Sequence, residues 1–141
     1  MHIYRNVFNE IINTPLETPQ EIGGIIGGNE GIVTKYYMDY GMCSEKACRY
    51  IPNVSLLNSV IAEWADEGTQ FMGIYHTHFF DVQTLSDGDI QYIKKILLGM
   101  PTYIDSLYFP LLVLPKRTMV CFKAIKNSGS VEIHNDSLIL I

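Results

Sequence analysis

The segment from Phe71 to His78 constrains the fold more than any other part of the sequence, because it joins an apolar strand pattern to two histidines. Phe, Met, Ile and Tyr residues precede His76 and His78, which lie one residue apart. Successive side chains of a strand point to opposite faces, so a strand places both imidazoles on one face and turns Thr77 to the other. Two imidazoles arranged in this way can bind one metal ion.

The start of a helix follows this strand after a short connection. The connection runs from Phe79 to Leu85 and ends at Ser86-Asp87-Gly88-Asp89, after which apolar residues recur at helical spacing. Asp89 therefore falls in the first turn of a helix. Two histidines and one carboxylate form the three-ligand set of a catalytic zinc site, in which water takes the fourth position. The sequence thus predicts a Zn²⁺ site whose ligands are His76, His78 and Asp89.

A hydrolytic metal site also needs a base for its water, and Glu21 is the candidate. Glu21 opens the segment from Ile22 to Gly28, a short apolar strand flanked by glycines. It sits directly at the start of this strand, whereas the rival acidic residues nearby do not. Those rivals are Glu10, Glu17 and Glu30.

The order of these residues resembles the JAMM motif of the MPN-plus (JAB domain) metalloproteases. The motif has an upstream Glu before a Gly-rich strand, then H-x-H, seven residues and S-x-x-D. In this sequence it reads Glu21, His76, His78, Ser86 and Asp89, and the recognisable pattern extends from about residue 21 to residue 97. One position departs from it, because the family usually has Pro after the second His and this chain has Phe79-Phe80. That departure concerns loop geometry and substrate fit more than metal binding.

The resemblance implies both a fold and an activity. The fold is a curved, largely β core with helices packed about it, similar to the cytidine-deaminase-like architecture. In the activity it implies, Glu21 is the general base, and Ser86 lies beside the open coordination position and donates a hydrogen bond to the oxyanion. Relatives hydrolyse bonds after the C-terminal Gly-Gly of ubiquitin, ubiquitin-like or sulfur-carrier proteins. The compact chain looks similar to stand-alone prokaryotic members, so a ubiquitin-like or sulfur-carrier protein is the expected partner and substrate.

The rest of the pattern predicts an α/β (α+β) chain that forms one domain over residues 1–141. Helices are expected from Tyr4 to Thr14, from about Asn53 to Gly68, and from Ser86 to Gly99. The glycines of 27–31 indicate a turn between two strands, and Pro110 indicates a strand that is bulged or lies at an edge. Strands are expected over 22–26, 31–39, 71–78, 108–114, 118–126 and 131–134.

Composition and charge exclude several classes of protein. Hydrophobic residues make up 48% of the chain and charged residues 18%, which excludes intrinsic disorder. A net charge of −5 without a cluster of Lys or Arg argues against a nucleic-acid partner. The sequence shows no signal peptide and no apolar run of membrane-spanning length, so no membrane partner and a cytoplasmic location are expected.

The candidate site residues and the cysteines also have interpretations that involve structure alone. Ser86 and Asp89 together form a helix-start signature, and this capping role is compatible with metal binding by Asp89. Cys43 and Cys48 could bind a second metal, although two ordinary thiols are the simpler interpretation, and Cys121 belongs to the core. Three residues are minor candidates for ligands: Asp81, Asp87 and His134.

Two other functions compete with a metallopeptidase. The main alternative is a non-catalytic scaffold, as in family members that have lost their ligands. The presence of all five motif residues argues against that alternative. A zinc deaminase would need H-x-E and P-C-x-x-C, and this sequence has neither.

Overall fold

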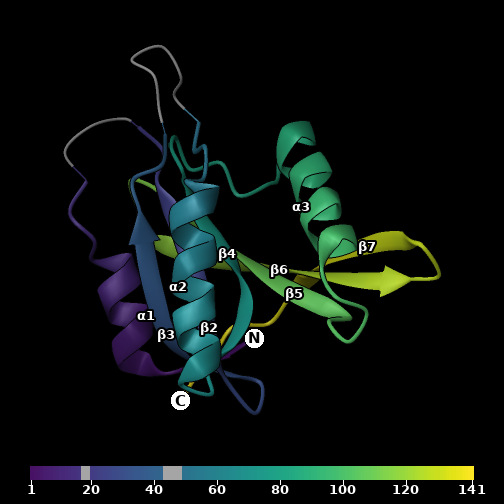
Figure 1. The fold of residues 1–141 in the computed structure, drawn as a ribbon. Coiled ribbons are helices and arrows are strands. Elements are labelled where there is room, and N and C mark those ends of the chain that lie inside the picture. Colours follow the sequence, from purple (N-terminus) through teal and green to yellow (C-terminus); the bar gives the residue numbers. More distant parts are fainter. Residues whose placement is uncertain (17–19, 43–48) are drawn as a thin grey trace.

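The computed structural model describes residues 1–16, 20–42 and 49–141, and in these ranges a curled sheet of eight strands packs with three helices (Figure 1). The first half of the chain forms β1 (His2–Ile3), α1 (Arg5–Ile12), β2 (Gly23–Asn29), β3 (Ile32–Asp39) and α2 (Val54–Asp66). The second half forms β4 (Gln70–His78), α3 (Asp87–Gly99), β5 (Ser106–Val113), β6 (Thr118–Asn127), β7 (Ser130–Asp136) and β8 (Ile139–Leu140). The predicted α+β class, with a curved mixed sheet and flanking helices, is confirmed.

The strand that carries the two histidines lies in the interior of the sheet. The strand order is β7-β6-β5-β4-β2-β3-β1-β8. β4 pairs antiparallel with β2 and parallel with β5, so the sheet is mixed. Each long edge of β4 is therefore hydrogen-bonded to another strand, which fixes the direction of its side chains.

Apolar side chains of neighbouring residues point to opposite faces of the sheet and meet different helices. Ile25 and Ile74 pack with α2 and α3, in a cluster that includes the buried Trp64. Ile26 and Tyr75, one residue further on, pack with α1 on the other face. Two helices thus cover one face and the third covers the other (Figure 1). His76 and His78 share the face of Ile74, which is the face of α2 and α3.

The glycines of β2 differ in position from the prediction. Gly27 and Gly28 lie inside the strand, and the turn is confined to Glu30 and Gly31, whose φ angles are 52° and 77°. Close packing explains the difference. A Cβ atom on Gly27 would lie 2.6 Å from the Trp64 ring, and one on Gly28 would lie 1.9 Å from the carbonyl oxygen of Ile32.

Replacing Gly27 with Ala is expected to lower the free energy of unfolding by about 1–3 kcal/mol, because the added methyl group overpacks the buried Trp64 ring. Urea unfolding followed by tryptophan fluorescence measures this effect. Gly99→Ala is the matched control, since nothing lies within 4 Å of a Cβ atom there. Equal stability of the two variants would contradict the packing role of Gly27.

Pro110 does not lie in an edge strand, so that part of the prediction is wrong. β5 lies between β4 and β6 in the sheet. Its ladder to β4 pairs Gly73 with Tyr108 and then His76 with Leu111, passing over Pro110, while its ladder to β6 is continuous. Proline has no N–H to donate, and the interrupted ladder on one side accommodates this lack.

Helix boundaries agree with the prediction to within two residues, and the turns at Arg117 and Ser128-Gly129 have the positive φ angles expected of tight hairpins. The two-residue strands β1 and β8 were not predicted. They are too short to show an alternating pattern.

Within the described ranges, no helix has the length and apolar character needed to cross a membrane.

Candidate metal centre

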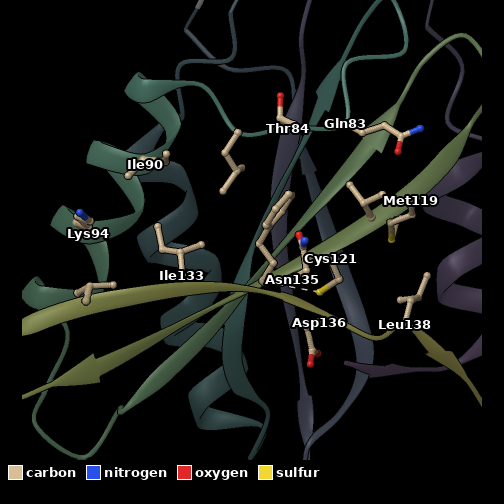
Figure 2. Close-up of a pocket in the computed structure, with 14 residues that line it drawn as sticks. Gln83, Thr84, Ile90, Lys94, Met119, Cys121, Ile133, Asn135, Asp136 and Leu138 are labelled. Atoms are coloured by element: carbon tan, nitrogen blue, oxygen red, sulfur yellow. Dashed lines mark hydrogen bonds between the residues drawn. The ribbon is translucent and has the colours of Figure 1, made fainter.

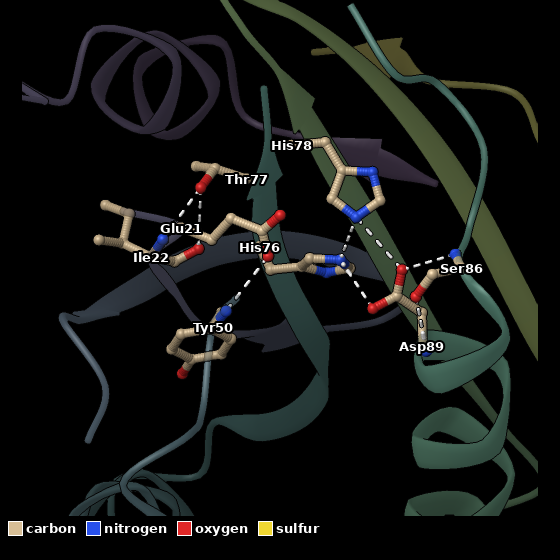
Figure 3. A network of polar contacts seen from close by, with 8 residues as sticks. All are labelled: Glu21, Ile22, Tyr50, His76, Thr77, His78, Ser86 and Asp89. Atoms are coloured by element: carbon tan, nitrogen blue, oxygen red, sulfur yellow. Dashed lines mark hydrogen bonds and ion pairs between the residues drawn. The ribbon is translucent and has the colours of Figure 1, made fainter. Parts of the chain in front are cut away.

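His76 and His78 extend from β4 toward Asp89 in the first turn of α3 (Figure 3). The two Nε2 atoms lie 3.1 Å apart. Nε2 of His76 lies 3.3 Å from Oδ1 of Asp89, and Nε2 of His78 lies 3.2 Å from Oδ2. These are the residues of the described chain whose potential ligand atoms gather within 4.8 Å of one another, so they form a group that could bind a metal ion.

The separations within this group fit a small tetrahedral ion. Ligand distances of about 2.0–2.1 Å in a tetrahedral zinc site place neighbouring ligand atoms about 3.3 Å apart. The three contacts that join His76, His78 and Asp89 measure 3.1–3.3 Å. Imidazole and carboxylate are also the donors that zinc accepts. The chain thus provides both the chemistry and the spacing of such a site.

The start of α3 determines where Asp89 points. Ser86 is the N-cap: its Oγ accepts a hydrogen bond from the Asp89 N–H at 3.1 Å, and its own N–H donates to Oδ2 of Asp89 at 2.8 Å. This is a reciprocal capping box. The predicted capping role is confirmed, and the cap holds the same carboxylate that faces the histidines.

The two aspartates that were alternatives to Asp89 lie elsewhere. Asp87 is exposed in the first turn of α3, and Asp81 faces Lys116, with Oδ2 and Nζ 3.7 Å apart. Neither belongs to the group of three.

Without metal, the contacts between Asp89 and the histidines shift the pKa values of Asp89 and His78. Burial raises the pKa of Asp89, but hydrogen bonds from His76 and His78 lower it further, so the net pKa lies far below the usual 3.8. Burial lowers the pKa of His78, but the hydrogen bond to Asp89 and the charges of Asp89 and Glu21 raise it above the usual 6.5. Without metal, this pairing stabilises the fold above about pH 4 and below about pH 6.5. The contribution of Asp89 is lost as the pH falls through its folded pKa, and that of His78 as the pH rises through its own.

Zinc binding is expected to be at least about tenfold weaker at pH 5.5 than at pH 7.5. The imidazoles must be neutral to bind metal, and Asp89 extends the protonated range of His78 upward. Competition titration against a chromophoric chelator at both pH values measures the dissociation constants. Equal affinity at the two values would show that the histidines are not ligands.

Glu21 reaches the site because β2 is hydrogen-bonded to β4 next to the histidines. Gly23 pairs with His76, and Thr77 holds the preceding residue, Ile22. The Thr77 N–H donates to the Ile22 carbonyl at 2.9 Å, and the Ile22 N–H donates to Oγ1 of Thr77 at 2.9 Å. Thr77 is fully buried on the face opposite the histidines. One side of β4 thus offers ligands, while the other fixes the chain that leads to Glu21.

Glu21, Ser86 and the three possible ligands line one pocket of about 830 Å³. Oε2 of Glu21 accepts a hydrogen bond from the backbone N–H of Tyr50 at 3.2 Å (Figure 3). Many of the remaining lining residues are apolar or aromatic, among them Ile51, Phe79, Phe80, Val82 and Tyr92. The pocket therefore combines a small polar centre with an apolar wall, as binding sites commonly do.

Phe80 marks the outer edge of this pocket. It is 88% exposed and has a φ angle of 58°. The residue before it, Phe79, stands at the position after the second His where the motif usually has proline. The backbone has positive φ angles at the next two residues, Phe80 and Asp81. Phe79 and Phe80 both line the pocket that holds the two histidines.

The other candidate residues do not join the metal centre. Glu10 is exposed on α1, and Glu30 lies in the turn at the far end of β2 from Glu21. His134 is exposed on β7 and contacts Glu132 at 3.3 Å. Three candidates lie outside the described residues: Glu17, Cys43 and Cys48.

Cys121 lies in a second pocket, of about 820 Å³, between α3 and the β6–β7 hairpin (Figure 2). The thiol is buried, as predicted for a core residue, and burial raises its pKa to about 12. It therefore stays protonated and unreactive at neutral pH.

Sequence reasoning missed Thr77 and Tyr50 as supports of Glu21. Thr77 offered a weak signal, because a polar side chain facing the core from an otherwise apolar strand needs a partner. Tyr50 offered none, since its contact with Glu21 spans 29 residues.

No family model and no curated protein matches this chain. Its fold resembles solved structures over the whole length. Protein DSY2949 from Desulfitobacterium hafniense matches with a TM-score of 0.69 at 16% identity, covering 99% of this chain and 92% of that one. AF2198, a JAB1/MPN domain protein from Archaeoglobus fulgidus, matches with a TM-score of 0.56 at 15% identity, covering 100% of this chain and 99% of that one.

Proposed function

We propose that this chain, which has the fold of a JAB1/MPN domain protein, is a zinc-dependent peptidase. The observation that carries the proposal is the convergence of His76, His78 and Asp89 in a pocket that Glu21 and Ser86 also line. Three ligands that leave a position open, with an acid–base residue beside them, make a hydrolytic site rather than a structural one.

The chemistry divides between the metal and the protein. When bound, zinc lowers the pKa of a water molecule and polarises a carbonyl group. Glu21 accepts the proton of the attacking water and returns it to the leaving nitrogen, which is general base and then general acid catalysis. The Ser86 oxygen already accepts from the Asp89 N–H, so its own proton is available to stabilise the oxyanion.

The proposed substrate is a ubiquitin-like or sulfur-carrier protein, cut after its C-terminal Gly-Gly by hydrolysis of a peptide or isopeptide bond. The resemblance to the JAMM motif supports this class. In such relatives the extended tail pairs with a strand through its backbone, a mode that suits Gly-Gly because it requires no side chains. The apolar rim at Phe80 and Val82 offers a surface for the body of such a substrate.

Incubation with ubiquitin-like and sulfur-carrier proteins encoded beside its gene, each extended after Gly-Gly, tests the proposal. Mass spectrometry should detect release of the extension by zinc-loaded protein and none after chelation. Less than about half an equivalent of zinc after metal addition and gel filtration would favour the scaffold alternative. A fully loaded protein that releases no extension would contradict the peptidase.

A further inference from the structure

Asp39, the last residue of β3, is a buried carboxylate in contact with Tyr50, which lines the pocket of His76, His78 and Asp89. It is 4% exposed. Oδ1 accepts from the Gly41 N–H at 2.9 Å, and Oδ2 accepts from the Tyr50 hydroxyl at 2.7 Å and from the Asn53 N–H at 2.9 Å. Across the described ranges, no Lys, Arg or His forms an ion pair with it. Three donors thus replace the hydration of this charge, and all three come from the segment between β3 and α2.

Tyr50 connects this carboxylate to Glu21. Its ring packs against the backbone of β2 at Gly23. The contact is so close that a Cβ atom on Gly23 would be 2.5 Å from Cε1 of the ring. Burial and the hydrogen bond to Asp39 raise the pKa of Tyr50, so the hydroxyl remains a donor. The backbone N–H of the same residue donates to Oε2 of Glu21. Tyr50 is therefore held at its ring and its hydroxyl, and its N–H then reaches Glu21.

We infer that Asp39 is a positioning residue for Glu21, acting through Tyr50, and this inference rests on the proposed function. The Glu21 side chain has several rotatable bonds, so a fixed donor on Oε2 limits the directions in which Oε1 can point. Oε2 is the oxygen that Tyr50 holds, so the proposed mechanism assigns the attacking water to Oε1. Asp39 therefore determines how well the base is aligned, although it touches neither metal nor substrate.

A purely structural role for Asp39 predicts different behaviour. If Asp39 only anchored the chain before α2, its loss would lower stability and leave the base in place. If it positions Glu21, its loss changes the surroundings of the metal even in a folded protein. The d–d absorption of bound cobalt(II) reports those surroundings without any substrate.

The experiment compares the visible spectra of cobalt-loaded wild type, Tyr50→Phe, Asp39→Asn and Glu21→Gln. Tyr50→Phe deletes one hydrogen bond to Asp39 and keeps the ring, so it should fold even where Asp39→Asn does not. Tyr50→Phe, and Asp39→Asn where it folds, should bind one equivalent of cobalt. Their spectra should be displaced from that of wild type toward that of Glu21→Gln. Tyr75→Phe is the matched control, because its buried hydroxyl has no hydrogen-bond partner in the described chain and lies on the α1 face. Its spectrum should equal that of wild type.

Kinetics on a Gly-Gly-extended ubiquitin-like substrate give the second readout. For Tyr50→Phe, kcat should fall by about 10- to 100-fold with KM nearly unchanged, since a small misplacement of a reacting group costs this much. Wild-type spectra and wild-type kcat in both variants would overturn the positioning role and leave the peptidase proposal intact. Displaced spectra together with a wild type that cleaves no substrate would support the positioning role and contradict the peptidase.

Discussion

Replacing Glu21 with Gln is expected to lower kcat for hydrolysis after Gly-Gly by about 10²- to 10⁴-fold, because an amide cannot accept the proton of the attacking water. Zinc content should stay at one equivalent, since Glu21 is outside the group of three possible ligands. Gln retains the size of Glu and an oxygen that can accept from the Tyr50 N–H. Initial rates by mass spectrometry, together with elemental analysis of the purified variant, measure both quantities.

Glu30→Gln is the control for this substitution. It makes the same chemical change in the turn at the other end of β2, on an exposed residue. Its rate should equal that of wild type. If Glu21→Gln kept more than about one tenth of the wild-type rate, Glu21 would not be the general base.

Replacing His78 with Ala is expected to abolish stoichiometric zinc binding. His78 is 6% exposed, and its Nε2 contacts both His76 and Asp89. Its loss would remove one of the three possible ligands and leave an empty space beside the other two. In wild type, zinc at 100 times its Kd is expected to stabilise the folded state by about 2.7 kcal/mol and to raise Tm by roughly 10 °C. The variant should show almost no such rise in calorimetry.

His134→Ala is the matched control for the loss of an imidazole. His134 is exposed on β7 and is not a member of the metal group. This variant should bind zinc and gain stability from it as wild type does. One equivalent of zinc retained by His78→Ala, with an unchanged rise in Tm, would contradict the assignment of the site.

Local patterns in the sequence predicted much of this architecture. The alternation in Phe71 to His78 placed both histidines on one face of a strand, and the S-x-x-D signature placed Asp89 at a helix start. Such signals depend on residues within a few positions of one another, and the backbone geometry of one strand or one turn decides the outcome. The structure brings the ligand atoms of these residues together.

Features that depend on distant contacts could not be predicted. The register that brings Ile22 beside Thr77 joins residues 55 positions apart, and the three donors that surround Asp39 are an outcome of tertiary packing. The turn expected at Gly27 was misplaced for the same reason: only the position of Trp64 on α2 shows that this glycine serves close packing in a strand. The interior position of Pro110 likewise follows from the strand order.

The three possible metal ligands, His76, His78 and Asp89, come from two elements that differ in rigidity. His76 and His78 belong to a strand hydrogen-bonded along both edges, which opens only when the whole sheet comes apart. Asp89 belongs to the first turn of a helix outside the sheet, where backbone amides fray most easily. An ion bound by all three residues would therefore cross-link the rigid sheet to the more mobile first turn of α3. Metal binding should therefore slow amide hydrogen exchange most in the first turn of α3. It should change exchange least in β4, the strand that supplies two of the three ligands.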